Sequence, residues 1–264
     1  MNTHDRTIIG IAGGLGPYAH IEFERLLLEA TGHRMDRLPV DQDYPEWVVS
    51  CVPRTPDRTL ALLDEGPSPL PDLVRSVERL AKAGAAFAII PCNTAHAFIE
   101  AIRERTSIPI VDMLDLTVQE ATASGEDAGA IGLLATTGTC RTRIYHDRVE
   151  RMPGGRLLSV LDLPDGEELQ RRLVMTPIYG PFVDGRHIGG GIKSGTVTPA
   201  VTAALGEAVE RLVEAGAGRV ICGCTEIPIG LGRGSWKGTP LIDPMEVAAR
   251  AAVAFAFGDA PPPC

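Results

Sequence analysis

Short apolar runs rich in β-branched residues alternate along the chain with longer stretches in which apolar residues recur every three or four positions. The short runs predict strands at residues 7–11, 47–51, 87–90, 130–134, 157–161 and 219–221. The periodic stretches predict helices at residues 19–31, 71–83, 95–105, 141–151 and 200–215. Because helices alternate with strands, the pattern predicts an α/β protein in which helices cover parallel sheets.

The second half of the chain repeats the first. Residues 77–84, VERLAKAG, return as residues 209–216, VERLVEAG, and the same offset of 132 maps Cys92 onto Cys224. Two further matches keep the order, residues 9–11 with 131–133 and residues 108–112 with 239–243. Three matches in one order indicate an internal duplication. A chain of 264 residues can hold two such domains, since domains usually contain about 100–150 residues.

The composition limits the classes of partner. A net charge of −9 disfavours nucleic acid or an anionic membrane, because both are bound through basic surfaces. Residues 1–7 lack the apolar core of a signal peptide, and no apolar run approaches the ~20 residues of a membrane span. We therefore expect a cytoplasmic protein whose six cysteines are reduced thiols.

Cys92 and Cys224 each follow an apolar strand and precede polar residues. Ligands of open parallel sheets bind beyond the carboxyl ends of the strands, so both thiols are expected at such an edge. Backbone N–H groups and the dipole of the next helix would lower the pKa of a thiol there from about 8.5. A pseudo-twofold arrangement of the halves would place the thiols on opposite walls of one cleft. They could then transfer protons to both faces of one carbon.

The other cysteines have a simpler interpretation. Free cysteine is among the most buried residue types, so a structural role in the core is favoured for Cys51, Cys140 and Cys222. Cys264 ends a Pro-rich tail and is expected to have no chemical role. A zinc site is disfavoured, because Cys222 and Cys224 have no second close pair of ligands.

A Gly-rich turn follows the first predicted strand. Gly14 and Gly16, with Ala19 and a later Asp36, fit a dinucleotide-binding fingerprint loosely. Pro17 lies inside the turn, however, and no strand is evident near Asp36. The favoured alternative is that the turn holds a carboxylate on bare backbone amides.

Three polar features near these motifs could serve a binding site. Arg58 and Lys193 lie in loop-like contexts and are the best candidates to clamp a carboxylate, Arg58 through a bidentate fork. His96 follows Cys92 by four residues, so it lies either near the thiol or on the surface of a helix. The Gly-rich residues 179–195 form either a functional loop or lid, or a solvated insertion.

These motifs resemble the cofactor-independent aspartate/glutamate racemase superfamily, and most closely its aspartate racemase branch. The matching segments are IGIAGGLGP, TPDRT, PCNTAH, IPIVDM, GLLATTGT, IKSG and GCTEIP, in that order. The resemblance implies two similar Rossmann-like lobes with the active site in the cleft between them, commonly in a homodimer. It also implies that the lobes exchange strands, with residues 1–106 plus 233–264 in the first lobe and 107–232 in the second.

The same resemblance implies the chemistry of the site. Cys92 and Cys224 would be the two catalytic bases of a racemase that inverts the α-carbon of an acidic amino acid, aspartate first and glutamate second, without cofactor or metal. Arg58 and Lys193 would grip the acidic side chain. The remaining substrate-binding residues would be Leu15, Asn93, Thr94, Thr136, Thr137, Thr225 and Glu226, of which Asn93, Thr94 and Thr225 would line the α-amino and α-carboxylate groups.

Three departures from the branch lie near the expected side-chain pocket. Leu15 stands where methionine is usual, Cys51-Val52 where polar amides are common, and residues 181–190 form an extra segment of about ten residues. Two alternatives therefore stay open. One is another enzyme of the superfamily, such as a hydantoin racemase or a maleate isomerase that uses one cysteine as a nucleophile. The other is a non-catalytic protein that binds an amino acid.

Overall fold

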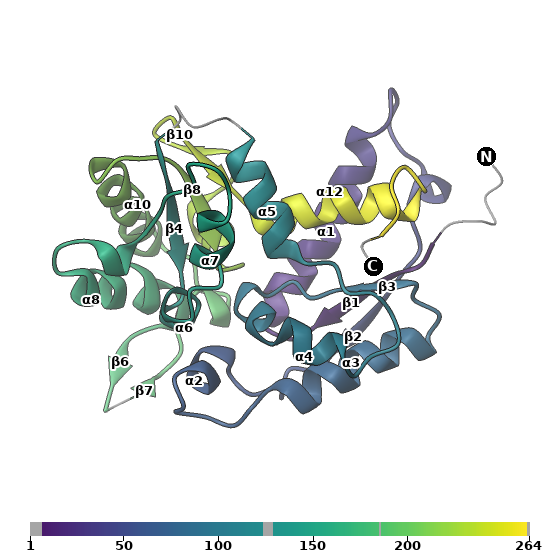
Figure 1. Cartoon of the computed structure of the whole chain (residues 1–264), viewed down its shortest axis with the longest axis horizontal. Coiled ribbons are helices and arrows are strands. Elements are labelled where there is room, and N and C mark those ends of the chain that lie inside the picture. Colours follow the sequence, from purple (N-terminus) through teal and green to yellow (C-terminus); the bar gives the residue numbers. More distant parts are fainter. Residues whose placement is uncertain (1–6, 124–128, 185, 263–264) are drawn as a thin grey trace. The chain divides into compact units, whose positions relative to one another are not determined.

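The structure is a computed structural model, and it describes residues 7–123, 129–184 and 186–262 (Figure 1). The chain divides into two compact units. One is formed by Met1–Met113 with Met245–Cys264 and the other by Leu114–Pro244. The lobe boundaries expected at residues 106 and 233 lie slightly earlier in the chain and stay a prediction. No described helix is both long and apolar enough to cross a membrane.

The sheet of the first unit is parallel. Its central strand β1 (Ile9–Gly13) pairs on one side with β2 (Trp47–Cys51) and on the other with β3 (Phe87–Ile89). A further parallel bridge joins Ala88 of β3 to Ile110. This gives the spatial order β2, β1, β3 and then the segment around residue 110.

The sheet of the second unit repeats this order. Strand β4 (Ala130–Ala135) lies between β5 (Leu157–Ser159) and β8 (Ala217–Gly223), and β10 (Thr239–Ile242) pairs with the other side of β8, all in parallel. The short edge strand β9 (Ser235–Trp236) runs antiparallel to β10. The predicted α/β architecture with parallel sheets is confirmed.

The pairing register shows that the two sheets are equivalent. Ile9 lies opposite Phe87 in the first, and Ile131 opposite Arg219 in the second. The Ala88–Ile110 bridge likewise corresponds to the pairing of Val220 with Leu241. The repeat in the sequence is therefore a repeat of strand order and register.

Helices connect and cover the strands. The first unit contains α1 (Pro17–His33), α2 (Arg58–Leu62), α3 (Leu70–Lys82), α4 (Ile99–Arg103) and nearly all of α12 (Pro244–Ala256). The second contains nearly all of α5 (Met113–Thr122), then α6 (Thr137–Arg141), α7 (His146–Glu150), α8 (Gly166–Leu169), α9 (Thr176–Tyr179), α10 (Pro199–Glu214) and α11 (Ile227–Leu231). Helix α3 packs on β1 and β2, and α10 packs on β4 and β8 (Figure 1).

The longest equivalent helices, α3 and α10, end at matching residues. Lys82 and Glu214 are their last residues, and the glycines two positions later, Gly84 and Gly216, have φ of 91° and 100°. That left-handed conformation suits glycine and terminates each helix, as the sequence predicts. At the other end of α10, the Thr198 side chain accepts a hydrogen bond from the Val201 N–H group and caps the helix.

Two predicted helices differ from those observed. The segment 95–105 begins as a 3-10 helix, Asn93–Phe98, before α4 continues it. The segment 141–151 is not one helix, because α6 ends at Arg141 and α7 begins at His146. Arg143 has a φ of 56° between them, and this left-handed residue interrupts the helical path.

The extra segment folds as a small hairpin. Strands β6 (Phe182–Val183) and β7 (Arg186–His187) pair antiparallel, and the Ile188 N–H group donates a hydrogen bond to the Pro181 carbonyl. Gly180 approaches the backbone of Gly189 so closely that a Cβ on Gly180 would overlap its carbonyl group. The two ends of the hairpin therefore touch.

Candidate active site

Cys92 lies just beyond β3 in the first unit. It is 6% exposed and stands immediately before the 3-10 helix Asn93–Phe98. Its N–H group donates to the Ile90 carbonyl at 2.7 Å, and its own carbonyl accepts from Ala95 at 3.2 Å. Asn93 and Thr94, which follow, are also buried. The thiol is thus held at the carboxyl end of a buried strand, as expected.

His96 links this strand end to the next segment of the chain. Its Nε2 accepts a hydrogen bond from the Met113 N–H group at 3.2 Å, so the proton lies on Nδ1, which donates to the Cys92 carbonyl at 2.9 Å. The ring is buried, so the surface location considered for His96 is wrong. Both nitrogens bond to backbone groups, and this gives the ring a structural role.

Arg58 and Leu15 meet in the first unit. The Arg58 guanidinium is buried and donates to the carbonyls of Leu15 at 3.0 Å, Pro56 at 3.0 Å and Thr55 at 3.4 Å. These bonds fasten the Gly-rich turn to the start of α2, and α2 in turn lies against the 3-10 helix that follows Cys92. Arg58 therefore organises the loops at this end of the sheet.

The Gly-rich turn is close-packed. Gly14 has a φ of 88°, and a Cβ there would lie 2.5 Å from the Val52 backbone nitrogen. The Gly14 N–H group donates to Nδ1 of His20 at 3.3 Å, and burial lowers the pKa of His20, which keeps the ring neutral. One of the amides expected to hold a carboxylate is thus engaged by His20. No motif in the sequence points to His20, although it lies one helical turn after Gly16.

Cys224 belongs to a polar cluster in the second unit. It follows β8, is 5% exposed, and its thiol donates to Oε2 of Glu226 at 2.9 Å. The Thr225 hydroxyl donates to the same oxygen at 3.1 Å, and Nζ of Lys193 lies 2.8 Å from Oε1. We call Lys193, Cys224, Thr225 and Glu226 the Cys224 cluster. It unites four of the predicted site residues.

Electrostatics fix the protonation of this cluster. Burial and the negative charge of Glu226 raise the pKa of Cys224 well above its ordinary value, although Lys193 opposes them. Burial would also raise the pKa of Glu226, but the charge of Lys193 and the hydrogen bonds to the carboxylate hold it below its ordinary range. At neutral pH the cluster is therefore a thiol, a carboxylate and an ammonium group. The lowered pKa expected at a strand end is wrong for Cys224, because burial and the charge of Glu226 together outweigh the nearby N–H groups.

The extra hairpin reaches this cluster through Tyr179. Lys193 Nζ lies 5.3 Å from the centre of the Tyr179 ring, and the His187 ring stacks on Tyr179 with centroids 5.2 Å apart. The His187 Nδ1 atom is 2.8 Å from the Gly180 carbonyl, and Phe182 contacts the other side of the His187 ring edge-on. Lys193 thus lies against Tyr179, which precedes the hairpin, and Tyr179 lies against His187, which belongs to the hairpin.

Thr136 and Thr137 lie at the end of β4, next to β8. Ala135 pairs with Gly223, so Thr136 follows one strand end where Cys224 follows the neighbouring one. Thr136 is buried and caps α6 through the Thr139 N–H group at 3.5 Å. The Thr137 hydroxyl accepts from Nε2 of Gln170 at 3.4 Å. Both threonines therefore lie at the edge predicted for the site.

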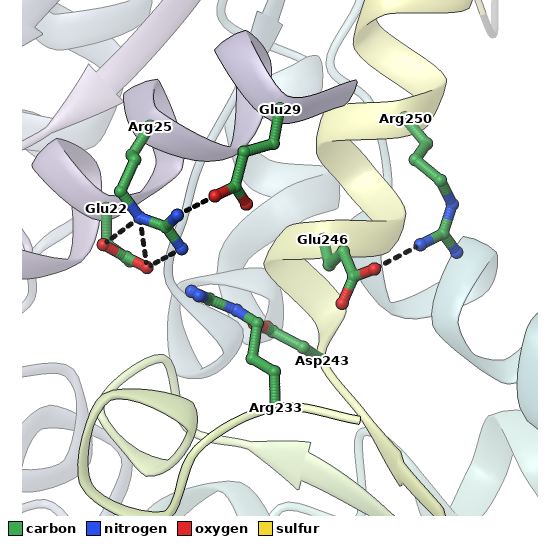
Figure 2. A network of polar contacts seen from close by, with 7 residues as sticks. All are labelled: Glu22, Arg25, Glu29, Arg233, Asp243, Glu246 and Arg250. Atoms are coloured by element: carbon green, nitrogen blue, oxygen red, sulfur yellow. Dashed lines mark hydrogen bonds and ion pairs between the residues drawn. The ribbon is translucent and has the colours of Figure 1, made fainter. Parts of the chain in front are cut away.

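Asp243 ends β10 at the same edge. Figure 2 shows its pairing with Arg233, whose Nε lies 2.8 Å from Oδ2 of the buried carboxylate. The same figure shows ion pairs within single helices, Arg25 with Glu22 and Glu29 on α1, and Arg250 with Glu246 on α12. Pairs within an exposed helix contribute little to stability, whereas Asp243 is 3% exposed and needs its partner.

The other described cysteines divide into two kinds. Cys140 and Cys222 are buried, as expected, and burial raises the pKa of Cys140 to about 12 and that of Cys222 well above its ordinary value. Cys51 is exposed at the end of β2, so the core role expected for it is wrong. Among the described residues, no group of three His, Cys, Asp or Glu side chains is arranged to hold a metal ion.

Comparison with known proteins identifies relatives along nearly the whole chain. A profile of the Asp/Glu/hydantoin racemase family matches residues 13–252. A glutamate racemase from a Parafrankia strain is 28% identical over 62% of this chain and 53% of its own length. The broad specificity amino-acid racemase RacX of Bacillus subtilis is 29% identical over 52% of this chain and 58% of its own. The chain thus aligns with little more than half the length of these curated relatives.

Among solved structures, the fold is similar to that of an aspartate racemase from Picrophilus torridus. The TM-score is 0.74 at 22% identity, and the match covers 96% of this chain and 94% of the other. An aspartate racemase homologue from Pyrococcus horikoshii gives a TM-score of 0.64 at 20% identity, covering 95% and 99%. At this level of identity the likeness concerns the fold alone.

Proposed function

Because the chain belongs to the Asp/Glu/hydantoin racemase family, we propose that it is a cofactor-independent amino-acid racemase whose two bases are Cys92 and Cys224. The observation that carries the proposal is the equivalence of the two cysteines. Each lies four positions beyond a matching bridge residue, Ala88 in β3 and Val220 in β8, and both thiols are buried among polar neighbours. A duplicated fold that retains a thiol at both equivalent strand ends suits a reaction with two equivalent proton-transfer steps.

The proposed arrangement places the substrate between the two units, which correspond to the two lobes of the family. The expected lobe boundaries at residues 106 and 233, the pseudo-twofold relation of the lobes, and assembly as a homodimer belong to the same proposal. Two bases on opposite sides of the α-carbon are required, because a single base would return its proton to the face from which it came.

The protonation of the Cys224 cluster supports one assignment of the first roles. A two-base reaction begins with one thiolate and one thiol, and the raised pKa of Cys224 makes it the thiol. Cys92 then removes the α-proton, and Cys224 delivers its proton to the other face. Glu226 accepts a hydrogen bond from the thiol in the resting state. For the opposite enantiomer the roles are exchanged.

Stabilisation of the carbanion provides most of the proposed acceleration. Placement of a general acid and base contributes about 10²–10⁴-fold, which is small beside the difficulty of ionising an α-carbon. Backbone N–H groups at the strand ends and the hydroxyls of Thr94 and Thr225 would hydrogen-bond the α-carboxylate as it takes up enediolate charge. Asn93, Thr136 and Thr137 would complete this polar edge.

The choice of side chain depends on Lys193 and Arg58. An acidic substrate, aspartate first and glutamate second, would place its second carboxylate against these cations and beside Leu15. The pairing of Lys193 with Glu226 favours a second candidate, because this cation already has an internal carboxylate at 2.8 Å. In that case the pocket accepts a wider range of side chains. The relative from Bacillus subtilis is named a broad specificity amino-acid racemase.

Proton NMR in deuterated buffer tests the proposal directly. The protein is incubated with L-aspartate, L-glutamate, L-alanine and L-lysine in turn, and the α-proton signal and the chirality of the product are followed. Loss of the signal together with the D-enantiomer is expected for aspartate or glutamate. Exchange of alanine and lysine at comparable rates would favour the broader pocket.

Variants at each cysteine provide the controls. Cys92→Ser and Cys224→Ser should both abolish racemisation, whereas Cys264→Ser, a change in the Pro-rich tail, should leave it unchanged. Ligand-dependent thermal stabilisation without any α-proton exchange would instead identify a binding protein. A covalent adduct on one cysteine, seen by mass spectrometry, would identify maleate isomerase chemistry.

A further inference from the structure

The amino end of the second unit's sheet contains a cavity with two arginines. Its volume is about 220 Å³, and its walls include Arg156, Arg219, Thr122 and the glycine turn at residues 153–155. Arg219 is the third residue of β8, and Cys224 follows the opposite end of that strand. Five residues at about 3.3 Å each separate the two positions by roughly 16 Å. The cavity is therefore distinct from the Cys224 cluster.

Arg219 has an unusual environment for a cation. It is 7% exposed, and its Nε atom is buried without a hydrogen-bond partner. Burial lowers its pKa, and neither Arg219 nor Arg156 has an acidic partner among the described residues. A buried cation without a counter-charge is unfavourable, so such positions are normally paired or bind an anion.

The first unit shows that the fold does not require these arginines. The residue opposite Ile9 in β3 is Phe87, whereas the residue opposite Ile131 in β8 is Arg219. Phe87 is fully buried and packs edge-on against Phe255. The position equivalent to Arg156 is Glu46, because the Ile9 and Ile131 N–H groups donate to the carbonyls of Glu46 and Arg156. The amino end of the first unit's sheet thus carries an apolar and an acidic residue. The amino end of the second unit's sheet carries two positive charges at the equivalent positions.

A β-bulge directs Arg219 into its position. Ala130 pairs with Ala217 and Ile131 with Arg219, so Gly218 is an extra residue on β8. A bulge of this kind re-aims the side chain that follows it and is frequent beside functional sites. The glycines of the 153–155 turn present backbone rather than side chains to the cavity, and this leaves room for a ligand among the residues that line it.

We propose that this cavity binds a small oxyanion, either free phosphate or the phosphate group of a phosphomonoester. The planar guanidinium forks of Arg156 and Arg219 match tetrahedral oxyanions through paired hydrogen bonds. A cavity of about 220 Å³ admits a phosphate with a small substituent. The site is independent of racemisation, because it lies at the other end of the strand and contains neither cysteine.

Titration calorimetry at constant ionic strength tests the proposal on the intact protein. Inorganic phosphate and glycerol phosphate are titrated in parallel, and the tighter of the two identifies the source of the oxyanion. Saturable binding is expected to weaken about tenfold or more in both Arg219→Met and Arg156→Met, since each change removes charged hydrogen bonds. Arg171→Met is the matched control, because it removes one positive charge from an exposed helix pair with Glu168.

The outcomes separate a specific site from general charge attraction. Absence of saturable binding, or equal binding by the wild type and either cavity variant, overturns the proposal. Equal weakening in Arg171→Met would show that net charge alone governs binding and would overturn it as well. Circular dichroism checks that each variant folds, and Arg156→Met keeps the test valid if Arg219→Met does not, because Arg156 is exposed. Neither result depends on racemase activity.

Discussion

The two units carry the same strand order and the same register, yet the ends of their equivalent strands differ in chemistry. After β3, Cys92 precedes Asn93 and Thr94, neutral residues next to a histidine whose two ring nitrogens bond to backbone groups. After β8, Cys224 precedes Thr225 and Glu226, and the carboxylate draws Lys193 into an ion pair. A duplicated scaffold has thus kept its thiols and diversified their neighbours. The difference implies that the two thiols lie in different electrostatic surroundings.

Replacing each thiol tests whether the two units contribute equally, and we expect this to have the largest effect. Cys92→Ala and Cys224→Ala should each abolish measurable racemisation, a loss in kcat of at least about 10²–10⁴-fold, the usual contribution of a positioned acid or base. Exchange of the α-proton with solvent from one enantiomer should survive in one variant and from the other enantiomer in the second. Chiral chromatography combined with deuterium NMR measures both. Full activity in either variant would contradict the two-base mechanism.

Neutralising Glu226 removes the main difference between the two thiols. Glu226→Gln should lower the pKa of Cys224, because a negative charge that raises it is lost while Lys193 remains. Alkylation of Cys224 by iodoacetamide, followed by mass spectrometry between pH 7 and 9, should become about tenfold faster at the lower pH values. The variant should also be less stable by about 3 kcal/mol, since an ion pair of a buried carboxylate is broken.

Lys193→Met is the matched variant for Glu226→Gln. It breaks the same ion pair but removes the positive charge, so it should raise the pKa of Cys224 further and slow alkylation. Changes in the same direction for both variants would mean that general loosening of the cluster, rather than charge, controls the thiol.

The turns after β1 and β4 lie at equivalent places in the two units, so substitutions in them compare the backbones of the two units. Gly14→Ala should destabilise the protein by about 3 kcal/mol, because its φ is 88° and the added Cβ meets the Val52 backbone at 2.5 Å. The equivalent residue Thr136 has an ordinary φ and supports its turn as a helix cap, so Thr136→Ala should cost about 1 kcal/mol. Urea unfolding measures both. A smaller cost at Gly14 than at Thr136 would contradict the close packing of the glycine turn.

The smallest expected effect concerns one buried histidine in each unit. Burial is the largest influence on both His20 and His146 and lowers the pKa of each from 6.5. Below that pH the unfolded chain binds more protons than the folded one, so stability present at neutral pH is lost as the pH falls. The free energy of unfolding should therefore decrease between pH 7 and 5.5.

The variant His20→Asn keeps an acceptor for the Gly14 N–H group but does not titrate in this range. It should remove about half of the pH dependence, and His146→Asn should remove the rest. Urea unfolding at several pH values measures this slope. A protein that becomes more stable between pH 7 and 5.5 would contradict the lowered pKa values.

The sequence predicts the parallel sheets, the repeat and most long helices because these follow from periodicity. Gly84 and Gly216 end their helices as expected, since only glycine readily adopts the conformation required there. Local signals failed where tertiary contacts decide the structure. The left-handed Arg143 that separates α6 from α7 has no sequence signal, and neither does the exposure of Cys51 at the end of β2.

The candidate site likewise contains residues that the local sequence pattern predicts and residues whose roles depend on tertiary contacts. The two cysteines and Glu226 are placed as expected because strand ends place them. The role of His20 at the glycine turn and the support of Lys193 by Tyr179 and His187 depend on packing between distant segments. Periodicity carries no information on such contacts. The raised pKa of Cys224 likewise arises from burial together with a charge, and neither can be read from the spacing of residues alone.

The contact between Gly180 and Gly189 has a consequence for the history and engineering of the chain. A hairpin whose ends already touch can be removed as a unit, since a single new peptide bond could join the two ends directly. Its gain or loss in one recombination event would leave β8, α10 and the Cys224 cluster in place. The same junction offers a site for grafting other loops beside Tyr179, and libraries inserted there would vary the surroundings of Lys193 while the framework stays constant.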